Sequence, residues 1–173
     1  MRDHLLSFGR ERLEQTGATH TVNNQLVKAR KKTHNRWFEM QDSIAYWNDF
    51  MKPKIVYSEI VREPQFYLDA SGEFLVEATA FLLTGEHLDY LIKLLNSKVL
   101  SYIYRHFYAG GGLGGDAYRY KKAFLEKLPL PYYTPSTLCK SIENSTEVAE
   151  EEILALYHFT QEEAAYLKQV TGI

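Results

Sequence analysis

Residues 85–108 carry the strongest pattern in the sequence and constrain its fold more than any other segment. Apolar side chains recur there at steps of three and four residues, as on one face of an α-helix. They are Leu88, Leu91, Ile92, Leu95, Val99, Ile103 and Phe107. Thr84 suits the N-cap of this helix, and Glu86 and Asp89 suit the positive end of its dipole. The pattern predicts one long central helix, ended by the glycine run 110–115.

Strand-like segments precede this helix. Residues 54–60 (KIVYSEI) are rich in β-branched side chains and predict a strand. Residues 66–69 and 73–83 predict a hairpin, because a Ser-Gly turn signal separates them. Strands followed by helices, without alternation, favour an α+β fold over a doubly wound sheet. We therefore expect a small mixed or antiparallel sheet over about 54–83, packed with the helix over about 85–108 and with C-terminal helices.

The remaining segments predict shorter elements. An imperfect apolar stripe predicts a helix over 4–15, and the Thr, Gly and Asn content of 16–25 predicts a loop. We expect residues 1–131 to form the core of one domain and 132–173 to form a connector and helical appendage of that domain. Helices are also expected over 120–128, over 147–157, and from a capping-box sequence at Thr160 to near Gly172.

Charge is unevenly distributed, although the formal net charge is only −2. Residues 26–36 (LVKARKKTHNR) hold five Lys and Arg side chains and no acid. Residues 98–122 hold five against the single Asp116, whereas residues 143–163 hold seven Glu and no base. Two positive zones and a negative tail favour a local anion-binding face, with solvated helix surfaces as the alternative.

The glycine run 110–115 (GGGLGG) matches the pattern G-x-G-x-x-G. That pattern binds dinucleotides when a strand precedes it and a helix begins on it, but here a long helix precedes it. A small-molecule enzyme is therefore the weakest of the functions considered. The run is either a connector between helices or a loop whose bare backbone approaches a phosphate.

Other catalytic signals are missing from the sequence. The six histidines do not pair at helix spacing, and the single cysteine, Cys139, has no obvious base near it. The sequence contains no acid two residues before a lysine, as metal-dependent nucleases need, and no Pro-Pro dipeptide, as DNA amino-methyltransferases need. The N-terminus lacks the apolar core of a secretory signal, so we expect a cytoplasmic setting and no membrane partner.

Four stretches of the chain form a recognisable series. They are the Trp-containing 34–50, the Lys-Pro-Lys-Ile and "FxxD" strands of 52–69, the "LLNSK" helix of 91–104 and the "RYKKxFLEKLPxP" segment of 114–131. In this order they resemble the TaqI-like C-terminal specificity domain of type IIG restriction–modification enzymes and related N6-adenine DNA methyltransferases. The flanks 4–15 and 159–167 also fit such domains. Type I specificity subunits have a similar "LNS" helix and "LPxP" exit, so a type I-like fragment is an alternative.

The resemblance implies a module that recognises double-stranded DNA and has no catalytic residues of its own. A neighbouring methyltransferase domain or subunit would bind S-adenosylmethionine and flip an adenine, and some relatives also carry a Mg²⁺-dependent nuclease. No cofactor is expected in this chain. The alternative is a protein-interaction module that docks a methyltransferase subunit through the aromatic stretch 34–50 and the acidic tail.

Most candidate DNA contacts lie in the two positive zones, and Arg62 is added from outside them. Lys and Arg neutralise phosphates, and Arg also reads guanine edges. Asn35, Arg36 and Arg62 are the candidate base readers. The complete set is Lys28, Arg30, Lys31, Lys32, Asn35, Arg36, Arg62, Tyr118, Arg119, Lys121 and Lys122.

Overall fold

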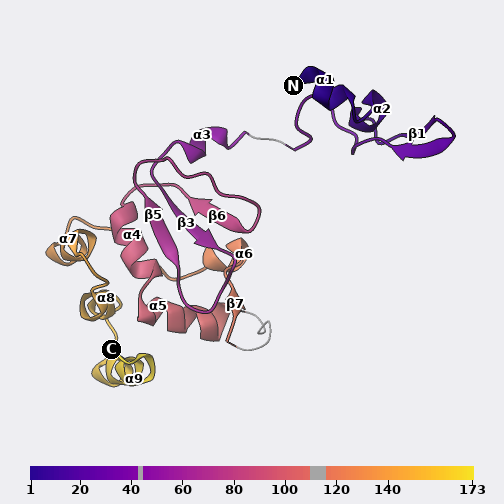
Figure 1. Ribbon diagram of the computed structural model, residues 1–173. Coiled ribbons are helices and arrows are strands. Elements are labelled where there is room, and N and C mark those ends of the chain that lie inside the picture. The colour runs from indigo at the N-terminus through magenta and orange to yellow at the C-terminus, as the bar shows by residue number, and fades with distance from the viewer. Residues whose placement is uncertain (43–44, 110–115) are drawn as a thin grey trace. The chain divides into compact units, whose positions relative to one another are not determined.

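The computed structural model describes residues 1–42, 45–109 and 116–173 (Figure 1). The glycine run 110–115 lies outside the described residues. The chain divides into two compact units, Met1–Trp47 and Asn48–Ile173. Helices and small antiparallel sheets make the fold α+β, as the sequence predicts. The expected boundary between residues 131 and 132 stays a prediction.

The N-terminal unit combines two short helices with a β-hairpin. The helix predicted over 4–15 is interrupted and consists of α1 (Arg2–Leu6) and α2 (Arg10–Leu13). The two are separated at Gly9, whose φ of 86° is incompatible with a right-handed α-helix. The prediction of a loop over 16–25 was also wrong. Strands β1 (Thr19–Val22) and β2 (Gln25–Lys28) pair there in antiparallel register.

A two-residue turn joins these strands. Asn23 and Asn24 have φ values of 50° and 62°, as the favoured hairpin turn with two left-handed residues requires. Asparagine tolerates that conformation better than most residues. The asparagines that suggested a loop are thus the turn of a hairpin.

The C-terminal unit is built on a three-stranded antiparallel sheet with the order β5-β3-β6. Strand β3 (Lys54–Ser58) is central and pairs with both β5 (Phe66–Asp69) and β6 (Ala80–Leu83). The predicted hairpin of 66–69 with 73–83 is therefore wrong, because β5 and β6 lie on opposite sides of β3. The Asp69 carboxylate accepts hydrogen bonds from the main-chain N–H groups of the next residues, which turns the chain into a loop instead of a tight return.

The long helix predicted over 85–108 is interrupted in the structure. It consists of α4 (Leu88–Leu95), α5 (Lys98–Ile103) and the π-helical turn η1 (Tyr104–Tyr108). Ser97 caps α5 by accepting a hydrogen bond from the Leu100 N–H at 3.1 Å. His87, with a φ of 52°, precedes α4 in place of the predicted cap Thr84.

Asn96, beside that break, ties the helices to the sheet. Its side chain accepts from the Phe66 N–H at 3.0 Å and donates to the Phe66 carbonyl oxygen at 2.9 Å. The break therefore fixes the start of β5 against the helices.

One face of the sheet packs on these helices to form the main core. Helix α4 contacts β5 and β3 (Figure 1). Ile55, Tyr57 and Phe66 are buried in this core together with Tyr104 and Tyr120. Burial of such side chains contributes to the stability of the unit, at roughly 25 cal/mol per Å² of apolar area removed from water.

A second, two-stranded ladder lies beside the main sheet. Strand β4 (Ile60–Val61) pairs with β7 (Tyr118–Arg119), and α6 (Lys122–Leu125) follows. Helix α3 (Trp47–Phe50) spans the sequence boundary between the two units. The short helix predicted over 120–128 is thus confirmed in part.

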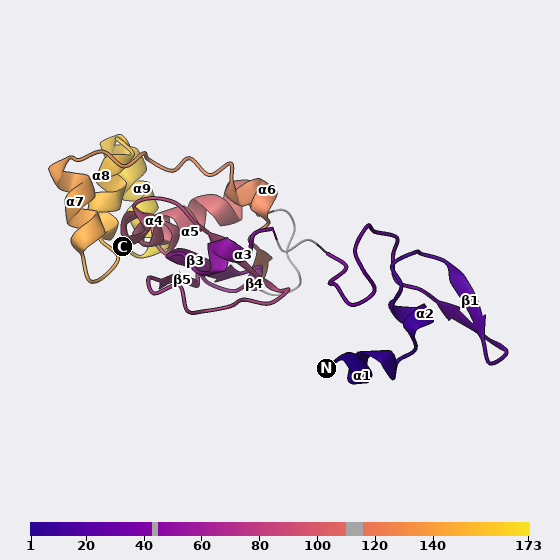
Figure 2. The same ribbon diagram turned by 90° about the horizontal axis from the view of Figure 1, so that it is seen from above.

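Helices α7 (Thr137–Asn144), α8 (Glu150–Leu156) and α9 (Gln161–Thr171) lie in a row beside α4 and α5 (Figure 2). The capping box at Thr160 is confirmed, and Gly172 ends α9 with a φ of 67°. Helix α7 is absent from the sequence-based expectation for 132–145, although Ser136 caps it and Cys139 is buried in it. No helix in the described part of the chain is both long and apolar enough to cross a membrane.

Candidate nucleic-acid interface

The first basic zone, Lys28–Arg36, lies in the N-terminal unit and is held in place by a buried glutamine. Gln15 is 3% exposed, and its Nε2 donates to the carbonyl oxygens of Arg36 and Glu39, both at 2.9 Å. Its Oε1 accepts from the Thr33 hydroxyl at 2.5 Å. One side chain thus fixes the loop that follows the hairpin.

Arg30 does similar structural work from inside the zone. Its Nε donates to the Leu13 carbonyl oxygen at 3.0 Å, and its Nη2 donates to those of Trp37 at 2.7 Å and Glu39 at 3.1 Å. The guanidinium is half-buried, unlike the neighbouring lysines. Arg30 therefore joins α2 to the 37–39 loop, a role that its place in a basic run did not reveal.

Replacing Arg30 with alanine is expected to destabilise the N-terminal unit by about 1.5–3 kcal/mol, the usual contribution of hydrogen bonds to a charged group. Both tryptophans of the chain, Trp37 and Trp47, lie in this unit, so tryptophan fluorescence during urea unfolding reports on it. The matched control is Lys31→Ala, which removes an exposed cation and should leave stability within about 0.5 kcal/mol. Equal effects of the two substitutions would contradict the structural role of Arg30.

The exposed cations of the first zone face no acid from their own stretch. Residues 15–38 contain no Asp or Glu, and Lys28, Lys31, Lys32 and Arg36 are exposed. In the whole unit, Lys and Arg outnumber Asp and Glu by eight to five, whereas the C-terminal unit has twelve against seventeen. The N-terminal unit is therefore the cationic part of the molecule.

Two further candidates of this zone make local contacts. The Asn35 amide donates to the Met40 carbonyl oxygen at 2.8 Å, and the Arg36 guanidinium lies 5.9 Å from the centre of the Phe38 ring. The Arg36 N–H also donates to the Glu39 carboxylate at 2.6 Å. Arg36 thus presents its charge on a ring that is 51% exposed.

The second basic zone, formed by Arg62, Arg105 and Arg119–Lys122, lies in the C-terminal unit around the β4–β7 ladder. Arg119 is opposite Ile60 in that ladder, and Arg62 follows β4 directly. Both arginines are exposed, and Arg119 lies 3.7 Å from the Glu59 carboxylate. The ladder therefore brings together candidates that are more than fifty positions apart in the sequence.

Tyr118 is a buried aromatic residue that contacts a cation of this zone. It is only 5% exposed, and the Arg105 guanidinium lies 5.0 Å from its ring centre. A cation over an aromatic face is attracted by the ring's quadrupole. Tyr118 is thus placed to hold Arg105, which was counted in the second positive zone but not among the predicted contacts.

The Tyr104 hydroxyl fixes the backbone of the same zone. It donates to the Arg119 carbonyl oxygen at 2.6 Å and accepts from the Lys121 N–H at 3.1 Å. Burial raises the pKa of Tyr104 above its usual value, so the phenol stays protonated. Lys121 and Lys122 are exposed, Lys122 lying 3.6 Å from the Glu126 carboxylate.

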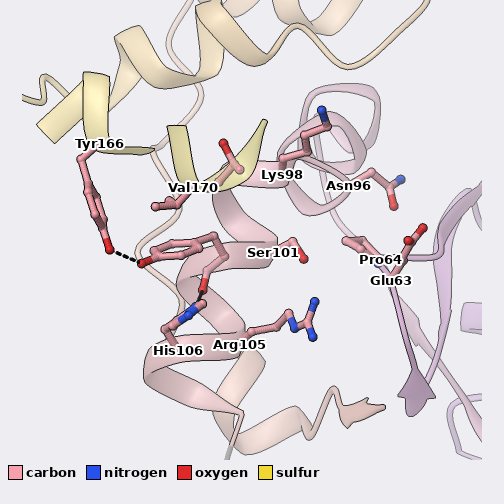
Figure 3. A pocket seen from close by; sticks show the side chains of 11 residues that line it. Glu63, Pro64, Asn96, Lys98, Ser101, Arg105, His106, Tyr166 and Val170 are labelled. Carbon is pink, nitrogen blue, oxygen red and sulfur yellow. Dashed lines mark hydrogen bonds between the residues drawn. The ribbon is translucent and has the colours of Figure 1, made fainter. Parts of the chain in front are cut away.

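A pocket of about 960 Å³ opens next to Arg105, between α5, η1 and α9. Figure 3 shows Arg105 pointing to the side that Glu63 and Pro64 form, away from Tyr166. The hydroxyls of Tyr102 and Tyr166 are 3.1 Å apart at the other side. The pocket is wide and polar, and it extends the surface on which Arg105 is exposed.

Metal-binding residues do not gather within residues 1–42, 45–109 and 116–173: no group of three or more His, Cys, Asp or Glu side chains there is arranged to hold an ion. The class defined by the fold and these surfaces is an α+β protein with basic zones exposed on each of its two compact units.

The profile of the TaqI-like C-terminal specificity domain matches residues 8–130 of the chain. The chain therefore belongs to this family, whose members serve DNA target recognition in restriction–modification enzymes. Specificity domains of this kind are typically non-catalytic. No curated protein matches the chain.

The motifs that identify the family build the core of the C-terminal unit. Lys54, from the Lys-Pro-Lys-Ile strand, and Asp69, from the "FxxD" strand, form a fully buried ion pair. Asn96 of "LLNSK" binds Phe66, and Tyr120 of the closing segment packs against Phe66 with ring centres 4.9 Å apart. These recognisable residues are thus structural, and the exposed candidates are other residues.

Proposed function

We propose that this chain binds double-stranded DNA sequence-specifically, as the specificity domain of a restriction–modification enzyme. The observation that supports this most is the acid-free stretch 15–38, which exposes Lys28, Lys31 and Lys32 on a member of a DNA target-recognition family. Phosphate contacts supply most of the affinity of such proteins and position them on the duplex.

The second basic zone adds contacts of the same type. Arg119, Lys121 and Lys122 are exposed, and the Tyr104 hydroxyl fixes their backbone. Arg62 and Arg105 offer planar guanidinium groups, which suit bidentate contacts to phosphate or guanine. In this proposal both zones contact DNA.

The proposal places catalysis in partner domains or subunits. A methyltransferase would bind S-adenosylmethionine, and a nuclease, where one exists, would bind Mg²⁺. The parent system is of type IIG in this proposal, with a type I-like specificity subunit as the alternative. The location is cytoplasmic, which the free buried thiol of Cys139 supports.

The salt dependence of duplex binding tests the proposal. Neutralising Lys31 and Lys32 to glutamine should reduce the slope of log K against log salt by about two units, because each phosphate contact contributes about 0.9. Fluorescence anisotropy with a labelled duplex and the full chain measures the slope. The matched control neutralises Lys52 and Lys140, two exposed lysines outside both zones, and should leave the slope unchanged.

An unchanged slope in the Lys31/Lys32 variant would contradict this assignment of phosphate contacts. A full chain without measurable affinity for any duplex would instead favour the protein-interaction module. That alternative predicts binding to a methyltransferase subunit in the absence of DNA, which gel filtration detects.

A further inference from the structure

The β1–β2 hairpin has one face that its own unit leaves open. Its register places Thr19 opposite Lys28 and Thr21 opposite Leu26, so these four side chains share a face. All four are exposed, Leu26 to 80%. The other face is less exposed, and β2 contacts α2.

Three amide side chains follow one another at the tip of the same hairpin. Asn23 and Asn24 form the turn, and Gln25 begins β2. All three are exposed. Asparagine and glutamine amides pair bidentately with the N6 and N7 edge of adenine in the major groove.

The size and charge of the hairpin fit a DNA groove. Adjacent strands lie about 4.7–4.9 Å apart, and the major groove, about 12 Å wide, admits a two-stranded β-ribbon. Lys28 lies on the open face, and Lys31 and Lys32 follow the hairpin in a stretch without acids. The charge complementarity therefore selects a polyanionic duplex as the occupant of this face.

We propose that the β1–β2 hairpin enters the major groove and reads base edges, an inference that rests on the function proposed above. The amides of Asn23, Asn24 and Gln25 contact adenine. Thr21 and Leu26 on the open face contact the methyl group of a thymine. Lys31 and Lys32 bind the flanking phosphates, which carry no sequence information.

A selection from a randomised duplex library, made with the full chain, tests this proposal. The wild type should enrich a motif containing A·T pairs. Asn23→Gly with Asn24→Gly keeps the hairpin turn, because glycine accepts the same φ values, and removes two amides. We expect discrimination at one or more A·T pairs to fall by about 5- to 150-fold, as loss of a bidentate base contact does.

A second variant and two controls separate reading from folding. Thr21→Ala with Leu26→Ala should relax preference at thymine positions, while Leu75→Ala, an exposed apolar residue of the C-terminal unit, should change nothing. Tryptophan fluorescence verifies that each hairpin variant is folded. The salt slope should stay at the wild-type value, because neither hairpin variant removes a charge.

The outcomes distinguish the two proposals. If the wild type enriches no motif and binds no duplex, the proposed function fails. If the wild type enriches a motif and both folded hairpin variants enrich the same motif with equal discrimination, the function stands and the role of the hairpin is overturned.

Discussion

Replacing Lys54 with methionine is expected to lower the free energy of unfolding of the C-terminal unit by about 3–5 kcal/mol, because it leaves a buried carboxylate without its counter-ion. Lys54 and Asp69 are both fully buried, and the Lys54 ammonium also donates to the Phe50 carbonyl oxygen at 2.7 Å. Twelve of the thirteen tyrosines lie in this unit, so near-ultraviolet circular dichroism during urea unfolding reports on it.

Adding Asp69→Asn to Lys54→Met should restore part of that loss, because the double variant buries no net charge and the amide oxygen can still accept from the Gly72 and Glu73 N–H groups. Two further observations would contradict this account. One is a free energy of unfolding of Lys54→Met within about 1 kcal/mol of the wild-type value, because a loss of about 1 kcal/mol is ordinary for a single substitution. The other is a double variant less stable than Lys54→Met alone.

The same pair makes stability depend on acid. Burial opposes ionisation of Asp69, but hydrogen bonds from Lys54 and from Phe74 outweigh it and hold the pKa of the carboxyl well below its usual value of 3.8. A depressed pKa adds stability above the unfolded value, and that stability is lost as pH falls through the folded value. Asp69→Asn should therefore show a shallower loss of stability below about pH 4 than the wild type.

Tyr104→Ala is expected to cost the C-terminal unit about 3–5 kcal/mol, the usual loss for a large aromatic side chain removed from a core. Tyr104 is fully buried, and its ring centre lies 4.5 Å from that of Tyr120. Tyr104→Phe keeps the ring but leaves the Arg119 carbonyl and the Lys121 N–H unpaired, at a cost of about 1–3 kcal/mol.

The phenylalanine variant also tests how the second basic zone is built. If the Tyr104 hydroxyl positions Arg119 and Lys121, Tyr104→Phe should weaken duplex binding even under conditions where the protein stays folded. The control is Tyr132→Ala at a 92% exposed position, which should change stability by less than about 0.5 kcal/mol. Duplex affinity equal to that of the wild type would show that the hydroxyl stabilises the fold without positioning the contacts.

Elements marked by an unambiguous local sequence pattern were predictable from the sequence. The Thr160–Glu163 capping box begins α9, and the β-branched run at 54–60 contains β3. The family itself was recognisable, because its motifs occupy positions where burial and the Lys54–Asp69 pair restrict the choice of residue. Each of these structural constraints involves only a few residues, so the corresponding pattern can be recognised in a single sequence.

Sequence patterns that are compatible with two structures led to wrong predictions. Asn96 and Ser97 lie within an unbroken apolar period, but α4 ends at Leu95. The Asn96 side chain binds the main chain of Phe66, and the Ser97 hydroxyl caps α5. Asn23 and Asn24 are typical of loops and equally of hairpin turns. The pairing of β5 and β6 with β3 instead of with each other depends on tertiary contacts that no local pattern encodes.

The candidate contacts show the same division. Lys28, Lys31 and Lys32 were predictable as exposed cations because lysine is rarely buried without a partner. Arg30 belongs to the same run, but three main-chain carbonyl groups bind its guanidinium. Arg105 was not among the predicted contacts, and its contact with Tyr118 joins segments that the sequence separates.

The ratio of two dissociation constants tests the central claim most directly. The full chain is titrated, at physiological salt, with the duplex it enriches from a random library and with a scrambled duplex of equal length and composition. Sequence-specific recognition predicts a ratio of about 10³ or more. Equal affinities for the two duplexes would mean that the chain holds DNA through its charge alone, and would contradict its role as the part that selects the target.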